Sequence, residues 1–280
     1  MSTIKQNNSC STEVCRGLDG QILYLMLESQ PDVLVDITRL NVSVGKPVWP
    51  LLQPKAAKAL ENAIHERGRL MVINSAYRTI AQQAILYKHS IAKRCGIVIA
   101  AKPGQSNHQS GLALDLSDAD GWQMFMRRAG YKRLMPHDPV HFDYQGGGVD
   151  LRNAATKAFQ RLWNENNDKT LKVDGDLGAQ TLQALLNSPL AGFPNGERYE
   201  VSKKKYSVGD RVLKFQNPIL EGEDVRTIQE RLNLLGAEIE VDGYFGTVTE
   251  TAIRRFQERN KINVDGIVGV EVLKILMDKK

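Results

Sequence analysis

The stretch SNHQSGLALDL at residues 106–116 decides the fold of the first half of the chain. Successive side chains of a β-strand point to opposite faces, so Leu112, Leu114 and Leu116 would lie on one face and Asp115 on the other. A carboxylate in so apolar a strand is costly unless another group compensates its charge. We therefore predict a strand that packs its leucines into a core and presents Asp115 on its open face.

A second strand-like stretch, DPVHFDY at residues 138–144, places His141 and Asp143 on one face. Two neutral imidazoles, from His108 and His141, would compensate the charge of Asp115 if all three side chains bound one Zn²⁺. This arrangement would leave a fourth coordination position open for water. His108, Asp115 and His141 are therefore the predicted metal ligands, and Zn²⁺ is the predicted cofactor.

The other three of the five histidines are not predicted to bind metal. His137 and His141 have the i, i+4 spacing of two ligands on one helix, but the two flanking prolines oppose a helix there. His65 and His89 fall within amphipathic helical segments and are predicted to be structural. Taken alone, His108 would be a surface loop residue and His141 a half-buried, hydrogen-bonded one.

The first half of the chain has the mixed pattern of an α+β domain. Apolar residues recur at helical spacing in segments that end near glycine, and strand-like runs separate them. In chain order the predicted elements are a helix at 55–67, a strand at 70–76, a helix at 79–94, a strand at 111–116, a helix at 122–129 and a strand at 140–144. We predict a catalytic domain at 20–148, built on a small antiparallel sheet whose open face carries the zinc.

A short repeat dominates the second half of the chain. The string Val-Asp-Gly-x-x-Gly occurs at 173–178, 241–246 and 264–269, each time after a helical segment that contains Phe-Gln or Ile-Gln. Asp-Gly favours a tight turn, and the second glycine allows close backbone approach before the next helix. The pattern predicts a small helical repeat module.

The copies of this repeat are unevenly spaced. We predict a partial unit at 149–190, a linker rich in Pro, Gly and charge at 191–210, and a complete all-α unit at 211–280. The partial unit can belong to this repeat module or pack against the catalytic domain, and the sequence leaves both arrangements open.

Charge and hydropathy exclude some classes of protein. The net charge of +5 suits an anionic partner such as a cell wall, although so mild an excess can simply aid solubility. Basic residues do not form a stripe interleaved with aromatics, so nucleic acid is not a predicted partner. No apolar run approaches the roughly 20 residues that span a membrane. The N-terminus lacks the pattern of a signal peptide, which predicts cytoplasmic synthesis followed by phage-type release or leaderless export.

The three cysteines, Cys10, Cys15 and Cys95, lack the CxxC spacing. Cys10 and Cys15 can form a pair or help to bind a metal, but we favour an N-terminal tail at residues 1–19 with reduced thiols. Cys95 follows an apolar helical segment and is predicted to pack there.

Three motifs in the first half resemble those of one enzyme family. SNHQSGLALD looks like the S-x-H-x-x-G-x-A-x-D signature of the zinc D-Ala-D-Ala carboxypeptidases and related phage L-alanyl-D-glutamate endopeptidases. DPVHF (138–142) resembles their second signature, and SAYRT (75–79) is similar to their S-x-Y-R-[ST] segment. The C-terminal repeats resemble the three-helix peptidoglycan-binding domain, whose hallmark is D-G-x-x-G-x-x-T, and the first copy departs by being half a unit.

The resemblance implies zinc ligation by His108, Asp115 and His141, a general base at Asp138 and a charge-stabilising role for Arg78. Zinc lowers the pKa of bound water from about 15.7 to about 7. Asp138, three residues before a ligand, can take a proton from that water and hand it to the leaving amine. Arg78 follows a predicted strand, from which its guanidinium can reach a developing oxyanion or a substrate carboxylate.

These observations predict a monomeric zinc peptidase of endolysin type that hydrolyses a stem-peptide bond of bacterial peptidoglycan. The bond is L-Ala–D-Glu or the terminal D-Ala–D-Ala. Many carboxypeptidases of this family use Glu as the base, and Asp138 is more reminiscent of the endopeptidase branch. The alternative is a non-catalytic, zinc-containing wall-binding protein, against which the intact base position argues. A muramidase would need two catalytic carboxylates, and the sequence shows a metal triad in their place.

Overall fold

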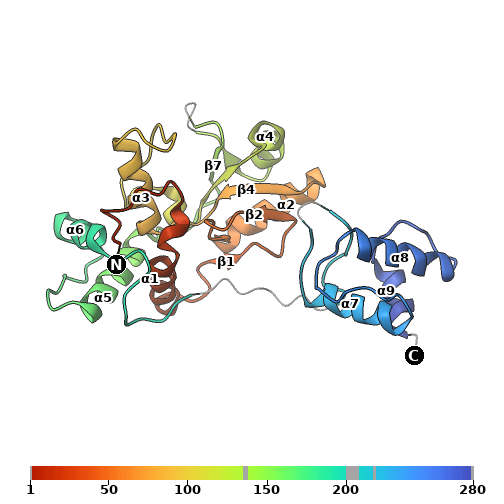
Figure 1. Cartoon of the computed structure of the whole chain (residues 1–280). Coiled ribbons are helices and arrows are strands. Elements are labelled where there is room, and N and C mark those ends of the chain that lie inside the picture. Colours follow the sequence, from red (N-terminus) through yellow and green to blue (C-terminus); the bar gives the residue numbers. More distant parts are fainter. Residues whose placement is uncertain (1, 135–137, 200–207, 217–218, 279–280) are drawn as a thin grey trace. The chain divides into compact units, whose positions relative to one another are not determined.

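The computed structural model describes residues 2–134, 138–199, 208–216 and 219–278. The chain divides into two compact units, Met1–Val201 and Ser202–Lys280, which are coloured red to green and blue in Figure 1. The prediction that His137 is not a ligand falls on a residue outside those described.

The first unit is built on a five-stranded sheet with the strand order β2-β4-β5-β7-β6. Its strands are β2 (Val42–Val44), β4 (Met71–Ser75), β5 (Ala113–Leu116), β7 (His141–Tyr144) and β6 (Tyr131–Lys132). A separate antiparallel pair joins β1 (Val35–Asp36) to β3 (Leu51–Leu52).

The prediction of a purely antiparallel sheet was wrong, because β2 pairs with β4 in parallel. The other pairings of this sheet are antiparallel. A long connection that contains a helix, α2 (Pro54–Arg67), joins β2 to β4. Such a crossover is what a parallel pair requires. The α+β class was predicted correctly, and the sheet is mixed.

One face of this sheet forms a core with two helices, α2 and α4 (Ala119–Arg128). Leu114 and Leu116 of β5 and Phe142 of β7 are fully or almost fully buried in this core. Because side chains alternate along a strand, Asp115 and His141 lie on the opposite face of the sheet. The predicted division of these residues between the two faces is confirmed, but the second face is not open, since His141 and Asp143 are each only 4% exposed.

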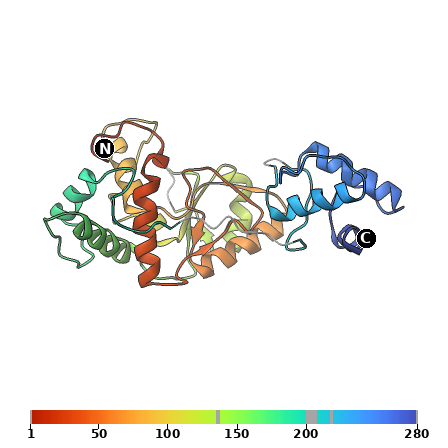
Figure 2. The ribbon, with the colours of Figure 1, turned by 60° about the horizontal axis from the view of Figure 1, so that its bottom comes forward.

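A second core holds the N-terminal segment, the helices α1 and α3, and the partial repeat. Its elements are the 3₁₀ helix η1 (Thr12–Cys15) and the helices α1 (Arg16–Ser29), α3 (Ile80–Ile91), α5 (Arg152–Asn166) and α6 (Ala179–Asn187). Figure 2 shows α1, in red, beside α5, in green. The partial repeat therefore packs within the first unit, which is the second of the two arrangements that the sequence left open.

Two segments predicted to be loose are packed in this core. Ile4, within the predicted tail, is completely buried. Phe193, within the predicted linker, is 7% exposed, and its backbone N–H and C=O both bond to the Gln21 amide, at 2.8 and 3.0 Å. A linker-like composition rich in Pro and Gly does not reveal such anchoring, because the partner lies more than 170 residues away in sequence.

The prediction of reduced thiols in the N-terminal tail was wrong for Cys10, which forms a disulfide with Cys95. The pairing follows from the path of the N-terminal segment along the end of α3. Lys88 donates hydrogen bonds to the carbonyls of Ile4, Lys5 and Asn7. Cys15 is a free, buried thiol.

Within residues 208–216 and 219–278, the second unit contains three helices around one core: α7 (Glu223–Leu234), α8 (Thr247–Arg259) and α9 (Val270–Asp278). No helix among the described residues of either unit is both long and apolar enough to cross a membrane.

A glutamine clamp explains the repeated sequence motif. In the complete unit, Gln229 accepts from Gly243 N–H at 2.8 Å, and its amide donates to Asp242 at 2.7 Å and to Thr249 at 3.0 Å. Gln160 makes the same three kinds of contact in the partial unit, and Gln257 makes the first two in the last copy. The Phe-Gln or Ile-Gln pair thus ties each helix to the Asp-Gly turn that follows it.

Candidate metal centre

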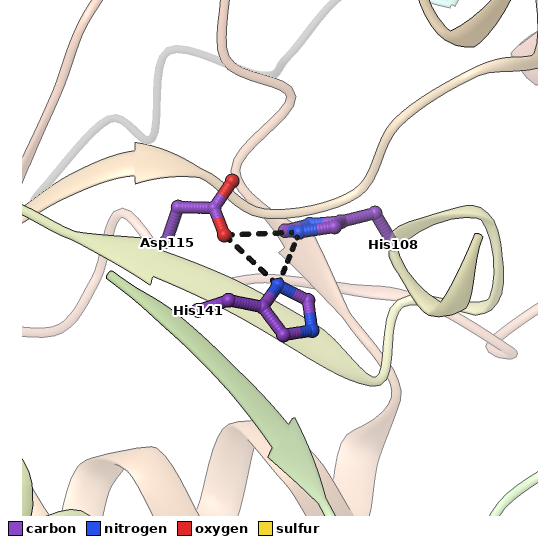
Figure 3. A group of neighbouring side chains, drawn as sticks. All are labelled: His108, Asp115 and His141. Atoms are coloured by element: carbon purple, nitrogen blue, oxygen red, sulfur yellow. Dashed lines mark hydrogen bonds and ion pairs between the residues drawn. The ribbon is translucent and has the colours of Figure 1, made fainter. Parts of the chain in front are cut away.

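The strand register brings two of the three predicted ligands together. Asp115 of β5 is the direct cross-strand partner of His141 on the antiparallel β7. His108 comes from the short 3₁₀ helix η2 (Asn107–Ser110), which ends at Gly111 in the left-handed region with φ of 63°. Figure 3 shows the three side chains converging on one point.

The three ligand atoms form a nearly equilateral triangle. His108 Nε2 lies 3.1 Å from His141 Nδ1 and 3.2 Å from Asp115 Oδ1, and the latter two atoms are 3.0 Å apart. Tetrahedral Zn²⁺ with bonds of about 2.0–2.2 Å would hold its ligands about 3.3 Å apart. Two imidazole nitrogens and a carboxylate oxygen are a zinc donor set, so the residues fit the metal in both chemistry and spacing.

The second nitrogen of His108 fixes the orientation of its ring. Nδ1 lies 2.8 Å from the carbonyl oxygen of Ala76, to which it donates when Nε2 carries the lone pair. Burial lowers the pKa of His108, and the charge of Arg78 lowers it further. Both effects favour the neutral ring with Nε2 free toward the centre, which is the form that a metal ligand needs.

Arg78 holds the other oxygen of Asp115. Its Nη2 donates to Asp115 Oδ2 at 3.1 Å and to Ser75 Oγ at 2.8 Å, while Nη1 donates to Gln83 at 3.1 Å. Burial alone would raise the pKa of Asp115, but the histidines and Arg78 outweigh it and hold this pKa well below its usual range. Asp115 is therefore a fixed carboxylate.

His141 lies between two carboxylates. Its buried Nε2 is within 3.0 Å of Asp143 Oδ1, although no described group meets it with hydrogen-bond geometry. Burial lowers the pKa of His141, but the hydrogen bond to Asp115 and the ion pair with Asp143 outweigh it and raise the pKa to about 9. The surroundings therefore favour positive charge here, which a proton or a bound cation supplies.

Asp138 begins the turn that leads into β7. Its backbone carbonyl accepts a hydrogen bond from the backbone N–H of His141 at 3.2 Å. This bond holds the backbone of Asp138 next to that of one predicted metal ligand. Burial lowers the pKa of Arg78, and the carboxylates of Asp115 and Asp138 act in the opposite direction. The Asp138 carboxylate is thus close enough to Arg78 for their charges to interact.

The residues that support the triad were not predicted from the sequence. Asn107 donates to Asp143 Oδ1 at 2.8 Å and so orients the carboxylate behind His141. Ser75 and Gln83 hold the guanidinium of Arg78. The alternation of β7 already placed Asp143 on the face of His141 and could have identified it, whereas nothing local indicated Gln83.

The fold and the site define an α+β domain with a candidate mononuclear metal centre, followed by a helical repeat unit. Known protein families match the same two parts of the chain. The profile of the D-alanyl-D-alanine carboxypeptidase VanY matches residues 52–144, and that of a peptidoglycan binding domain matches residues 221–276. The chain therefore contains a VanY-type peptidoglycan peptidase domain and a peptidoglycan-binding domain, and it is a peptidoglycan hydrolase.

Individual relatives are also cell-wall hydrolases. The N-acetylmuramoyl-L-alanine amidase CwlL of Bacillus licheniformis is 32% identical over 96% of this chain and 72% of its own length. The peptidoglycan L-alanyl-D-glutamate endopeptidase CwlK of Bacillus subtilis is 34% identical over 30% of this chain and 53% of its own length. A vancomycin resistance D,D-pentapeptidase VanY, solved with Zn(II), is 20% identical over 40% of this chain and 80% of its own, with a TM-score of 0.30.

Proposed function

We propose that the protein hydrolyses the L-Ala–D-Glu bond of peptidoglycan stem peptides with one Zn²⁺ held by His108, Asp115 and His141. The single observation that carries the proposal is the triangle of ligand atoms, with sides of 3.0–3.2 Å, on the face of the sheet opposite the apolar core. We also propose that the protein is a modular endolysin that acts as a monomer, a role that the order of a peptidase followed by a wall-binding domain suits.

The residues around the triad have complementary roles in this hydrolysis. When bound, the metal supplies a water whose pKa is about 7 and polarises the scissile carbonyl. Asp138 takes a proton from the attacking water and delivers it to the departing amine of the stem peptide. Arg78 keeps Asp115 in place and sets a fixed positive charge beside the reacting carbonyl, where an oxyanion develops.

The choice of bond rests on two observations. The base position is Asp138, and an Asp base is more reminiscent of the endopeptidase branch. The match to CwlK, which is named for the L-alanyl-D-glutamate bond, also favours this bond. The second candidate, cleavage of the terminal D-Ala–D-Ala bond, is favoured by the VanY profile over residues 52–144.

Mass spectrometry of purified soluble muropeptides after digestion tests the proposal. Endopeptidase cleavage leaves L-Ala on the muramic acid and releases a peptide that begins with D-Glu. Carboxypeptidase cleavage releases a single alanine, and amidase cleavage releases a peptide that begins with L-Ala. A chelator should stop the reaction, and added Zn²⁺ should restore it.

Asp138→Asn separates catalysis from metal binding. The variant should keep its zinc and its fold but lose about 10²–10⁴-fold in turnover, which is the usual value of general base catalysis. Near wild-type turnover would remove Asp138 from the mechanism. Zinc-loaded wild-type protein that releases none of the three products would favour the non-catalytic wall-binding alternative.

A further inference from the structure

The second unit contains a cavity of about 370 Å³ between the end of α7 and α8. Its apolar lining residues include Leu232, Ile239 and Phe256. Arg255 and Arg259, one turn apart on α8, also line it. A cavity with an apolar wall and a few fixed polar groups is the usual form of a small-ligand site.

The two arginines of the cavity have no carboxylate partner within the described part of this unit. Both are exposed, whereas the neighbouring Arg254 is paired with Glu250 at 2.8 Å. Like charges at i, i+4 repel each other and destabilise a helix. A bound anion would remove this repulsion, so the pair fits an anionic ligand.

The partial repeat of the first unit provides an internal comparison. The glutamine clamps align Gln160 with Gln229, and the residue three positions after each glutamine is Trp163 in the partial unit and Leu232 in the complete one. Trp163 packs against Phe159 and Phe193, with ring centroids 6.3 and 5.9 Å away. A large ring thus stands where the complete unit has the smaller Leu232 on its cavity wall.

The arginines also have no counterpart in the partial repeat. Thr181 and Thr249 are equivalent in the clamp, and six positions after them come Asn187 and Arg255. The helix α6 ends at Asn187, whereas α8 continues to Arg259. Because the clamped turn forms in both units, the repeat fold does not require the arginine pair.

We propose that this cavity binds the stem peptide of peptidoglycan, with Arg255 and Arg259 holding its carboxylates and the apolar wall receiving its alanine methyl groups. Guanidinium groups bind carboxylates with two parallel hydrogen bonds, which suits this ligand. Glu238, which also lines the cavity, is placed to accept from a free amine of the peptide. The inference rests on peptidoglycan being the partner and places the wall contact on the peptide, not on the sugar chain.

The test is sedimentation of the full-length protein with purified cell walls, in chelator so that no wall is cut. Arg255→Gln combined with Arg259→Gln should weaken binding at least about 10-fold, because the charge-assisted hydrogen bonds to the ligand's carboxylates are lost. The matched control is Lys214→Gln with Lys274→Gln, which removes the same charge from exposed residues of the unit outside the cavity. The control should change binding less than about 2-fold.

Competition identifies the part of the wall that is bound. A soluble stem peptide should release the protein from walls, and a chitin oligosaccharide should not. The proposal would be overturned if the arginine and lysine variants lost wall binding to the same extent. Release of the protein from walls by the chitin oligosaccharide but not by the stem peptide would also overturn it. Cleavage of small soluble muropeptides by the arginine variant should stay at the wild-type level, so failure of this inference is distinguishable from failure of the proposed reaction.

Discussion

Asp115 and His141 lie 26 positions apart in sequence but directly opposite each other on β5 and β7, with Oδ1 and Nδ1 at 3.0 Å. Residues opposite each other in an antiparallel pair have side chains on the same face, so the register alone brings these two groups together. A slip by one residue would move His141 to the other face and destroy the site. The geometry of the centre is therefore set by the sheet.

Metal analysis checks the ligand set. Purified wild-type protein should contain about one Zn²⁺ per chain, and His108→Ala and His141→Ala should each lose it, because only two protein ligands remain. His65→Ala is the control, since His65 lies on α2 away from the triad and should not affect zinc content. Full zinc in both the His108 and His141 variants would refute the assignment.

Replacement of Arg78 by Lys tests whether the guanidinium positions Asp115. Lys keeps the charge but cannot reach Asp115, Ser75 and Gln83 together. Loss of such a supporting contact typically weakens metal affinity by about 10–100-fold, and turnover should fall with it. Arg128→Lys, which alters a surface pair with Glu66, is the control. If Arg78→Lys lowers turnover but leaves zinc affinity unchanged, Arg78 has a catalytic role and does not position Asp115. If neither turnover nor zinc affinity changes, Arg78 has neither role.

Local periodicity was enough to predict the two strands that carry Asp115 and His141, but not the 3₁₀ helix that carries His108. The alternation in β5 and β7 and the helical spacing in α2 and α3 are short-range patterns, and each reports which face of an element is buried. The ligand set followed because charged or polar residues on an apolar strand need compensation.

Contacts between segments distant in sequence could not be predicted in this way. The parallel pairing of β2 with β4, the anchoring of Phe193 by Gln21 and the disulfide between Cys10 and Cys95 each join parts of the chain with no local signature. Composition suggested a tail and a linker, and the buried side chains that contradict this are few and scattered.

The disulfide predicts a redox-dependent stability of the first unit. Cys10→Ser should lower the free energy of unfolding by about 2–4 kcal/mol, because the bond closes a long loop and restricts the unfolded chain. All three tryptophans lie in the first unit, so their fluorescence during urea unfolding reports on this unit alone. Reductant should destabilise the wild type to the level of the variant and leave the variant unchanged. Wild-type stability that does not respond to reductant would contradict the pairing.

Asp19 of α1 is a completely buried carboxyl that ties this helix to the start of α3. It accepts hydrogen bonds from the hydroxyl of Thr79, the indole N–H of Trp49 at 3.3 Å and the thiol of Cys15 at 3.4 Å. Burial raises its pKa to about 7, although these three donors act in the opposite direction. Thr79 follows Arg78 in the chain, so this buried group supports the segment from which Arg78 reaches Asp115.

The raised pKa of Asp19 predicts how the stability of the first unit depends on pH. The unfolded chain releases the Asp19 proton near pH 4, while the folded protein keeps it until about pH 7. The stabilisation is therefore complete below about pH 4 and is lost as pH rises through 7, by an amount on the order of 4 kcal/mol. Asp19→Asn cannot ionise, so its unfolding free energy, followed by tryptophan fluorescence in urea, should fall less between pH 5 and pH 8 than that of the wild type. The other titrating groups are common to both proteins, so the difference between the two pH profiles reports on Asp19. If the unfolding free energies of the two proteins depend on pH equally, Asp19 is already ionised in the folded protein at pH 5.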